Sequence, residues 1–368
     1  MSEPRVLVAT PDFPPAVGGI QELTFQITTH LRRMSATVVT PASRGTWRDR
    51  GTEAQHVIRV GHVWLGRGAS VALTLAAFPF IAMWKRPELV LCAHPLLAPS
   101  AALAARMLRV PLVGVVYGKE IPHRSRGMRA LGRGADQVVA ISTYTAELAA
   151  AAGVPRAKTT VIPVGVTLPP AAGPLAGGSR VVVVARLVDA YKGHDVLLKA
   201  LVPVLAAVPD AHLDIVGDGP LAPGLRSLAV SLGVSHHVTF HGQLSDAGRD
   251  AVLDAASVFA MPSRLDEHGG GEGFGIVYLE AGARGLPVVA GNVGGATDAV
   301  VHGETGLLVD PTDPDAVAGA IVALLTDKDR ARSMGEAGRR WAERHAWPTI
   351  TARWEDLLLE VIDAHRRS

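Results

Sequence analysis

Cysteine is almost absent from this sequence: Cys92 is the only one among 368 residues. A single cysteine excludes both an internal disulfide framework and a cysteine metal site, and it fits a reducing compartment such as the cytoplasm. Because Cys92 lies in the apolar run "ELVLCAHP", we expect it to be a core residue of a strand and not a nucleophile.

Long apolar runs and targeting signals are also lacking. The N-terminal stretch "MSEPRVLVAT" has neither the basic region nor the apolar region of a signal peptide. The longest apolar stretch, residues 69–84, contains Pro79 and is shorter than the roughly 20 residues of a spanning helix. The sequence therefore predicts a cytoplasmic protein with a buried or interfacial helix at 69–84, and peripheral contact with the inner face of a membrane stays open.

Aromatic residues are scarce at 5%, and charge is divided unevenly along the chain. Residues 1–170 hold 19 Lys and Arg against 9 Asp and Glu, whereas residues 171–368 hold 17 against 25. Basic residues without interleaved aromatics and without a nucleic-acid motif argue against nucleic-acid binding. Two interpretations stay open. The excess of basic residues in the N-terminal half is chance variation of surface charge, or that half binds an anionic acceptor or lipid headgroups. The basic residues concerned are Arg106, Arg109, Lys119, Arg124, Arg126, Arg129 and Arg133.

Short β-branched runs alternate with segments of helix-forming composition through both halves of the chain. This alternation predicts parallel sheets covered by helices on both faces. The Pro/Gly/Ala-rich stretch at 167–179 reads as a linker. We expect an α/β protein with two doubly wound, Rossmann-like domains facing across a cleft, one at 1–170 and one at 171–348, and a final helix at 349–368 that crosses back onto the first.

The segment "LDEHGGGEGFGIVYLEA", residues 265–281, combines five glycines with two Glu eight residues apart. Gly273, Phe274, Gly275 and Ile276 are expected to open a helix, and a glycine-opened helix start offers free N–H groups to a phosphate. Glu272 before that helix and Glu280 about two turns in could accept hydrogen bonds from sugar hydroxyls. The alternative is a surface loop followed by a helix with a solvated Glu.

Two other segments follow predicted strands, where ligands bind in doubly wound sheets. In "ARLVDAYKGHD", Arg186 and Lys192 could hold a diphosphate, unless they are merely solvated cations. In "PDFPPAVGGIQE", Gly19 allows close approach of a phosphate, although a plain tight turn is as good an interpretation. The adjacent glycines do not form the G-x-G-x-x-G dinucleotide fingerprint. The stretch "DPTDPD" at 310–315 reads as turn and helix-start residues, not as a metal site.

Taken together, "GGI", "ARLVDAYKG", "IVGDGP" and "PSRLDEHGGGEGFGIVYLEAGARGLPVVAGNVGGATD" resemble the retaining glycosyltransferases of family four, which have the two-domain GT-B fold. The similarity covers essentially the whole chain. Within that family, "DFPP…GGIQ" and "GxGIVYLEA" are similar to motifs of phosphatidyl-myo-inositol mannosyltransferases.

The resemblance implies a hexose transferred with retention of its α configuration from a nucleotide-diphosphate sugar to an acceptor hydroxyl. The leaving phosphate takes the acceptor proton, so neither a protein nucleophile, a metal nor a further cofactor is expected. The acceptor is a small molecule or a lipid, and an anionic one fits the basic half. The resemblance also implies the donor site. Glu272 would hold the sugar, Glu280 the ribose, and Gly217 with Leu244 the base. The diphosphate would be held by Arg186, Lys192, Gly19, Gly273, Phe274, Gly275 and Ile276.

One position departs from the family pattern. Where many relatives carry a histidine after the strand "PLVGVV", this chain has Tyr117-Gly118-Lys119-Glu120. Tyr117 could hydrogen-bond a sugar hydroxyl and Lys119 could contact an anionic group. The departure leaves two alternatives to an active transferase: a non-catalytic nucleotide-sugar-binding protein and, from the doubly wound pattern alone, a dinucleotide-dependent oxidoreductase.

Overall fold

The chain divides into two compact units, each described by itself. The computed structural model describes residues 3–14, 18–42, 56–62, 64, 66–118, 121, 126–169, 178–267 and 269–367. Unit 1 comprises Met1–Gly165 together with Trp347–Ser368, and unit 2 comprises Val166–Ala346.

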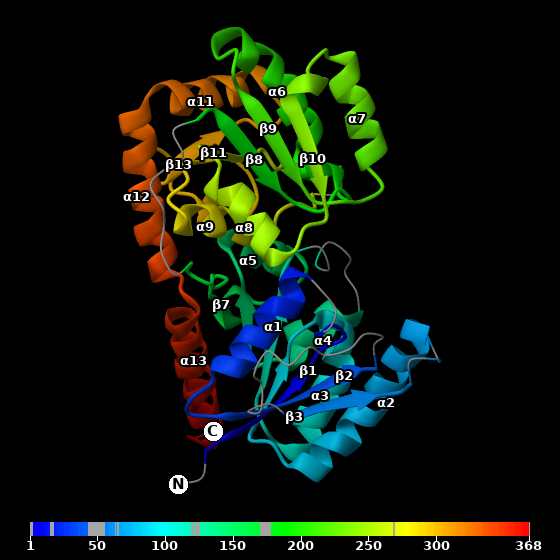
Figure 1. Ribbon diagram of the computed structural model, residues 1–368. Coiled ribbons are helices and arrows are strands. Elements are labelled where there is room, and N and C mark those ends of the chain that lie inside the picture. Colours follow the sequence, from blue (N-terminus) through cyan, green and yellow to red (C-terminus); the bar gives the residue numbers. More distant parts are fainter. Residues whose placement is uncertain are drawn as a thin grey trace. The chain divides into compact units, whose positions relative to one another are not determined.

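Unit 1 is built on a parallel sheet (Figure 1). Among the described residues it has seven strands in the order β3-β2-β1-β4-β5-β6-β7, and each neighbouring pair is parallel. The strand order reverses between β1 and β4, which is the switch point of a doubly wound sheet. The strands are β1 (Arg5–Ala9), β2 (Ser35–Pro41), β3 (His56–Val60), β4 (Leu89–Cys92), β5 (Leu112–Val116), β6 (Gln137–Ala140) and β7 (Thr159–Val161).

Helices cover both faces of this sheet. Helix α3 packs against both α2 and α4, whereas α1 packs against α13. A stripe of buried alanines on α3, including Ala101 and Ala104, brings that helix close to the sheet, as small side chains allow. The helices are α1 (Gly19–His30), α2 (Gly66–Lys85), the short η2 (Pro95–Leu97), α3 (Ala98–Leu108), α4 (Arg126–Gly134), α5 (Thr143–Ala151), the short η3 (Arg156–Lys158) and α13 (Trp347–Arg367).

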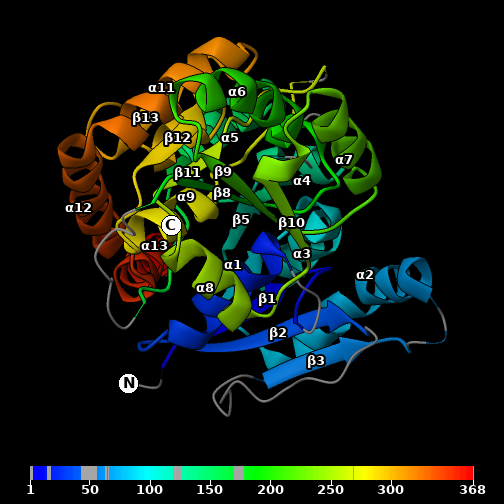
Figure 2. The same cartoon turned by 45° about the horizontal axis from the view of Figure 1, so that its top comes forward.

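The C-terminal helix α13 is part of unit 1 and lies beside α1 in both ribbon views (Figures 1 and 2). Its Trp354 is fully buried, and the buried carboxylate of Glu355 accepts a hydrogen bond from the backbone N–H of Arg33 at 2.7 Å. Glu355 thereby ties the chain after α1 to a helix more than 300 residues away in sequence.

Helix α2 is the long apolar segment seen in the sequence. Among the described residues it is the one helix whose length and mean hydropathy would allow it to cross a membrane, and 28% of its most apolar 18-residue window is buried. Core helices of soluble proteins pass the same test, so this finding by itself is weak evidence for a span.

Unit 2 has a second parallel sheet (Figure 2). Its described strands, six in number, follow the order β10-β9-β8-β11-β12-β13 with parallel pairing throughout. Four consecutive valines make β8 almost wholly apolar, as expected for a strand covered on both faces. The strands are β8 (Arg180–Val184), β9 (His212–Val216), β10 (Val238–Gly242), β11 (Val258–Met261), β12 (Val288–Gly291) and β13 (Gly306–Val309).

Two helical layers enclose the second sheet. Helix α6 packs against α7 and α11, and α9 packs against α12; Figures 1 and 2 show α6 and α11 side by side. The helices are the short η4 (Ala190–Lys192), α6 (His194–Ala207), α7 (Ala222–Ser231), the short η5 (Ser235–His237), α8 (Asp246–Asp254), α9 (Ile276–Ala283), α10 (Ala296–Ala299), α11 (Pro314–Thr326) and α12 (Lys328–Arg344).

The fold class inferred from the sequence, two doubly wound parallel-sheet units, is confirmed. Cys92 is a buried residue of β4, as expected, and burial raises the pKa of its thiol to about 12. In the stretch 310–315, the Asp310 carboxylate accepts a hydrogen bond from the backbone N–H of Thr312 within a turn, and Asp313 caps the start of α11. The prediction of turn and helix-start residues is therefore confirmed.

Candidate functional site

The predicted donor residues of unit 2 all come from loops or a helix that follow strands. Because the strands are parallel, their carboxyl ends meet at one edge of the sheet. Backbone hydrogen bonds join these loops: Gly217 N–H donates to the Gly242 carbonyl at 2.9 Å, Leu187 N–H to the Asp218 carbonyl at 3.0 Å, and Arg264 N–H to the Tyr191 carbonyl at 2.7 Å. The loops after β8, β9, β10 and β11 therefore form one connected rim.

An ion pair lies in this rim. The ammonium group of Lys192, at the end of η4, donates to the carboxylate of Glu272, 80 residues later in sequence. Both side chains are largely shielded, with 17% and 14% of their surface exposed. A shielded pair of this kind interacts more strongly than a pair on an open surface. The structure thus brings together the two residues to which the sequence assigned diphosphate and sugar contacts.

The other predicted cation, Arg186, follows β8 and is exposed. It belongs to the same charged neighbourhood, because its charge acts on Tyr191. Burial raises the pKa of Tyr191 above its usual value, the charges of Glu272 and Asp189 raise it further, and Arg186 opposes them. Lys192 Nζ also lies 5.3 Å from the centre of the Tyr191 ring, so both predicted cations and Glu272 lie near this phenol.

The glycine-rich segment ends at a helix start, but later than expected. Helix α9 begins at Ile276, its N-cap is Gly275, and no side chain caps it. Gly273 and Phe274 therefore precede the helix, and Glu280 lies little more than one turn inside it. The uncapped start leaves backbone N–H groups available to an anion.

Gly275 is required by its surroundings. Its φ of 88° is in the region that favours glycine, and a Cβ placed there would lie 2.4 Å from the ring of Tyr278. That ring is itself fixed, since the buried Tyr278 hydroxyl donates to the Met261 carbonyl at 2.9 Å and lies 2.8 Å from Ser263 Oγ. The end of β11 thus sets the position of the α9 start.

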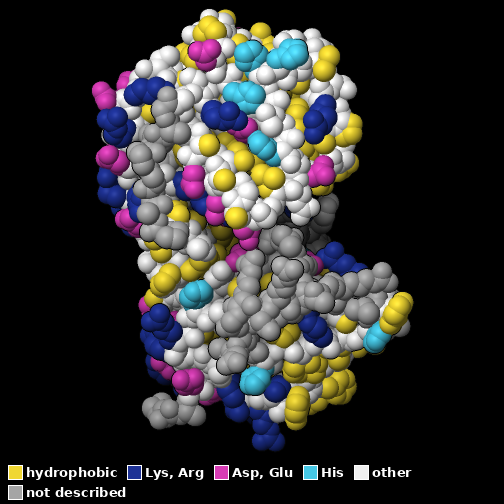
Figure 3. Space-filling model, in the orientation of Figure 1, with side chains coloured by type: hydrophobic (Ala, Val, Ile, Leu, Met, Phe, Trp, Pro, Cys, Tyr) yellow, Lys and Arg dark blue, Asp and Glu magenta, His cyan; other side chains and the backbone are white. Residues whose placement is uncertain are grey.

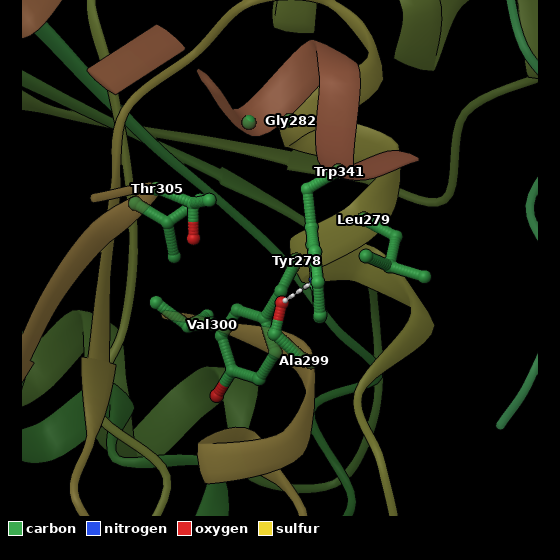
Figure 4. Close-up of a pocket in the computed structure, with 9 residues that line it drawn as sticks. Tyr278, Leu279, Gly282, Ala299, Val300, Thr305 and Trp341 are labelled. Atoms are coloured by element: carbon green, nitrogen blue, oxygen red, sulfur yellow. Dashed lines mark hydrogen bonds between the residues drawn. The ribbon is translucent and has the colours of Figure 1, made fainter. Parts of the chain in front are cut away.

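The side chain of Phe274 is 2% exposed, and its ring lies 6.3 Å from that of His345. Its backbone is therefore the part that a ligand could reach. Behind α9, Figure 4 shows a cavity next to Tyr278, Leu279 and Trp341, where Trp341 Nε1 donates to the Ala299 carbonyl at 3.0 Å. At about 10 Å³ this cavity suits one water molecule and not a nucleotide.

Sequence reasoning missed a second ion pair in the rim. Arg264, after β11, binds Asp195 of α6 through two hydrogen bonds of 2.9 and 3.2 Å. Together with the bond from its N–H to Tyr191, this pair fixes η4, and hence Lys192, against the end of β11. The signal was present, because Arg264 directly follows a predicted strand in "FAMPSR".

The residues assigned to ribose and base lie further along the same rim. Leu244 is half-buried after β10, and Gly217 follows β9. Glu280 is partly buried on α9 and acts on Arg249 of α8. Burial lowers the pKa of Arg249, but the charges of Glu280 and of two aspartates outweigh it and leave the pKa raised.

Unit 1 holds the remaining predicted residues. Gly19 opens α1, and a Cβ placed on it would meet no atom within 4 Å. Tyr117 follows β5 directly and is 6% exposed. Lys119 lies outside the described residues.

Two Rossmann-like units, the second with a charged rim beside a glycine-capped helix start, define the class of GT-B glycosyltransferases. Two family models match the chain consecutively: "Glycosyltransferase Family 4" at residues 17–169 and "Glycosyl transferases group 1" at residues 171–341. The chain belongs to this family and is a glycosyltransferase. The resemblance drawn from the motifs is confirmed, and the oxidoreductase and binding-protein alternatives are not supported.

Curated relatives match over nearly the full length. The GDP-mannose-dependent alpha-(1-6)-phosphatidylinositol monomannoside mannosyltransferase of Mycobacterium tuberculosis is 37% identical, over 96% of this chain and 98% of the relative. Its counterpart from Mycolicibacterium smegmatis is 36% identical over the same shares. The similarity to phosphatidylinositol mannosyltransferases is therefore confirmed.

Solved structures agree on the fold. Anabaena HepE in complex with UDP superimposes with a TM-score of 0.79 at 23% identity, covering 97% of this chain and 100% of that one. Sucrose-phosphate synthase from Thermosynechococcus elongatus gives a TM-score of 0.80 at 23% identity, covering 98% and 100%.

Proposed function

We propose that this protein is a retaining, metal-independent hexosyltransferase that moves a sugar from a nucleotide diphosphate to a hydroxyl of a phosphatidylinositol-type lipid. The observation that carries the proposal is the shielded Lys192–Glu272 pair in the rim that also contains the start of α9. The full-length relatives named for GDP-mannose and phosphatidylinositol monomannoside support the choice of donor and acceptor.

In the proposed donor site, the diphosphate is held by Arg186, Lys192 and the uncapped N–H groups at the start of α9. Positive charge at this position stabilises the negative charge that develops as the diphosphate leaves. Glu272 then accepts hydrogen bonds from the transferred sugar and Glu280 from the ribose. Gly217 and Leu244 border the base. From unit 1, we assign Gly19 to the diphosphate, and Tyr117 and Lys119 to the sugar and the acceptor.

The reaction needs no protein nucleophile in this proposal. The bond between the anomeric carbon and the phosphate oxygen breaks, and the acceptor oxygen bonds to that carbon on the same face. The acceptor proton passes to the leaving phosphate. The protein contributes orientation and charge, and a preorganised site of this kind supplies much of the rate enhancement when an anion leaves.

Metal independence is also a proposal. It rests on Arg186 and Lys192, two cations that can neutralise the charge of the diphosphate as a metal ion would. In the described part of the chain, no group of three or more His, Cys, Asp or Glu side chains is arranged to hold a metal ion. The test is turnover in EDTA, which should equal turnover in Mg²⁺; loss of turnover that Mg²⁺ restores would contradict it.

We further propose that unit 1 docks on an anionic membrane through an apolar face of α2 and α3, defined by Leu73, Phe80, Met83, Trp84, Leu103 and Met107. All six are exposed, with 69% of Phe80 and 73% of Trp84 open to solvent. Figure 3 shows hydrophobic side chains gathered at the lower right, where α2 lies. Large contiguous apolar patches usually mark interaction sites.

The charge around this face supports the choice of an anionic membrane as its proposed partner. The sequence from 64 to 109 contains five basic residues and one acidic residue, and that acidic residue, Glu88, is already bound by Arg366 at 2.8 Å. The basic residues are Arg67, Lys85, Arg86, Arg106 and Arg109. Exposed apolar side chains flanked by cations suit the interface of a cytoplasmic leaflet, where each cation contributes about 1 kcal/mol.

One experiment tests the transfer reaction. The protein is incubated with GDP-mannose and phosphatidylinositol monomannoside in mixed vesicles, with UDP-glucose as the alternative donor. We expect a product lipid one hexose heavier, whose new linkage has the α configuration by NMR. Inversion of configuration would contradict retention, and an unchanged lipid with both donors would contradict the proposed substrates.

Membrane docking is tested by sedimentation with vesicles. We expect binding to vesicles containing phosphatidylglycerol, weaker binding to pure phosphatidylcholine, and a further loss of binding as salt rises. Equal recovery in the supernatant with both vesicles would contradict docking. A dimer in solution that buries Trp84 would instead assign the face to a second copy of the chain.

A further inference from the structure

His194 is a buried histidine next to the ion pair of unit 2. It is the first residue of α6 and follows Lys192 and Gly193 directly. Only 3% of its surface is exposed, and in the described chain neither Nδ1 nor Nε2 has a hydrogen-bond partner. Buried polar groups are normally paired, because leaving them unpaired forfeits the hydrogen bonds they had with water. Two unpaired ring nitrogens therefore point to a partner that the protein itself does not supply.

The position of His194 is closely constrained. Gly193 has a φ of 77°, and a Cβ on it would lie 2.1 Å from the Pro262 carbonyl oxygen at the end of β11. The turn therefore places the start of α6 directly behind Lys192, whose ammonium group binds Glu272. Helix α6 has 14 residues and no side-chain cap, and its first backbone bond joins Leu197 N–H to the Gly193 carbonyl at 2.9 Å.

Burial, more than any neighbouring charge, keeps the ring of His194 neutral. Burial lowers the pKa of His194 to about 4, the cation of Lys192 lowers it as well, and Asp195 acts in the opposite direction. Lys192 is itself bound to Glu272, and Asp195 to Arg264. At neutral pH the ring therefore has one N–H donor and one acceptor nitrogen.

We propose that His194 is a positioning residue for the donor: its imidazole N–H donates to a diphosphate oxygen, directly or through one bound water, at the corner formed by Lys192 and the start of α6. The proposal rests on the proposed function, because it places the diphosphate at Lys192. A neutral donor beside Lys192 orients the phosphate without adding a second buried cation. It also gives the ring the partner that it lacks.

The first test compares His194→Leu with His194→Gln. Leucine has a similar volume but no polar atoms, whereas glutamine keeps one donor and one acceptor. We expect His194→Leu to retain or raise the melting temperature and to weaken binding of GDP at least tenfold, with UDP used if the wild type prefers it. His194→Gln should restore affinity to within about threefold. An amide in place of the ring restores a hydrogen bond, which a space-filling role would not need.

If His194 only fills space, His194→Leu will melt higher and bind the nucleotide as the wild type does, and this result overturns the inference. The NMR signals of ¹⁵N-labelled histidine give a second test on the wild-type protein, which does not depend on whether His194→Leu folds. The ring resonances missing from His194→Gln identify His194, and we expect them to shift with GDP or UDP. Resonances that stay in place while nucleotide binds also overturn it.

These tests separate the two proposals. A wild-type protein that binds neither GDP nor UDP contradicts both the proposed function and the role of His194, which depends on it. A wild-type protein that binds one of them, with equal affinity in His194→Leu, contradicts the role of His194 alone.

Discussion

In unit 2 two ion pairs lie at the carboxyl ends of the strands, whereas in unit 1 the conspicuous exposed side chains are apolar. Lys192 with Glu272 and Arg264 with Asp195 link loops from different strands. On unit 1, Phe80 and Trp84 point large apolar surfaces to solvent. The same sheet plan therefore supports two kinds of recognition: a preformed charged rim for a small ligand and an open face for an extended surface.

We expect the largest effect from removing the Lys192–Glu272 ion pair, on which the unit 2 side of this comparison depends. Lys192→Ala and Glu272→Ala should each lower kcat/KM at least 30-fold, about 2 kcal/mol of transition-state stabilisation. The double variant should lose less than the sum, because each residue binds the other. Steady-state kinetics measure this, with the exposed Lys199→Ala and Glu267→Ala as controls. Wild-type turnover in either test variant would contradict the assignment of this pair to the donor site.

Backbone geometry gives the next effect. Gly275→Ala places a methyl group against Tyr278 at a φ of 88°, and it should lower the free energy of unfolding by about 1–3 kcal/mol. Gly319→Ala is the matched control, because it lies inside α11 with no atom within 4 Å of the added Cβ. The control should gain about 0.5–1 kcal/mol. Denaturant melts that show equal stability for both variants would contradict the close packing at the α9 start.

The apolar face of unit 1 gives a third effect. Phe80→Glu with Trp84→Glu should weaken binding to anionic vesicles at least tenfold, because it places negative charge on an apolar surface that meets a negative one. Val202→Glu with Val230→Glu is the control, since it adds the same two charges at exposed positions on α6 and α7 of unit 2. Vesicle sedimentation measures both. Equal loss in the two proteins would mean that net charge, not this face, governs binding.

The last prediction concerns the pH dependence of stability, whose sign differs between the units. The pKa of His194 is lowered to about 4, so the unfolded chain takes up the proton first and stability falls as pH drops from about 6.5 towards 4. The pKa of Cys92 is raised to about 12, so stability falls as pH rises above 9. Urea midpoints across pH measure both slopes. His194→Leu should flatten the acid side and Cys92→Ala the alkaline side; unchanged slopes would contradict the assignment.

The sequence predicts most of the architecture, because most core strands are short apolar runs, rich in valine, that end in turn residues. Strand β3 (His56–Val60) was not predicted, since only three residues of "HVIRV" are apolar and none of its five residues is fully buried. An edge strand leaves a weak apolar pattern. Helix α9 starts later than expected, because Gly275 has a left-handed conformation that ends the loop.

The candidate site was only partly predictable. Lys192 and Glu272 could each be singled out by composition and by strand-end position, but their pairing across 80 residues depends on the strand order. Arg264 and Asp195 meet for the same reason. His194 could not be found from spacing, because an unpaired buried ring is a property of packing and not of a motif.

The most direct test of the central claim, that Lys192 and the start of α9 hold the donor diphosphate, is calorimetric binding of GDP and UDP to Lys192→Ala and Glu272→Ala. We predict at least tenfold weaker binding for Lys192→Ala. Glu272→Ala should bind as tightly as the wild type or more tightly, because it loses a nearby negative charge and frees Lys192. Unchanged affinity in Lys192→Ala, or equal losses in both variants, would contradict the account.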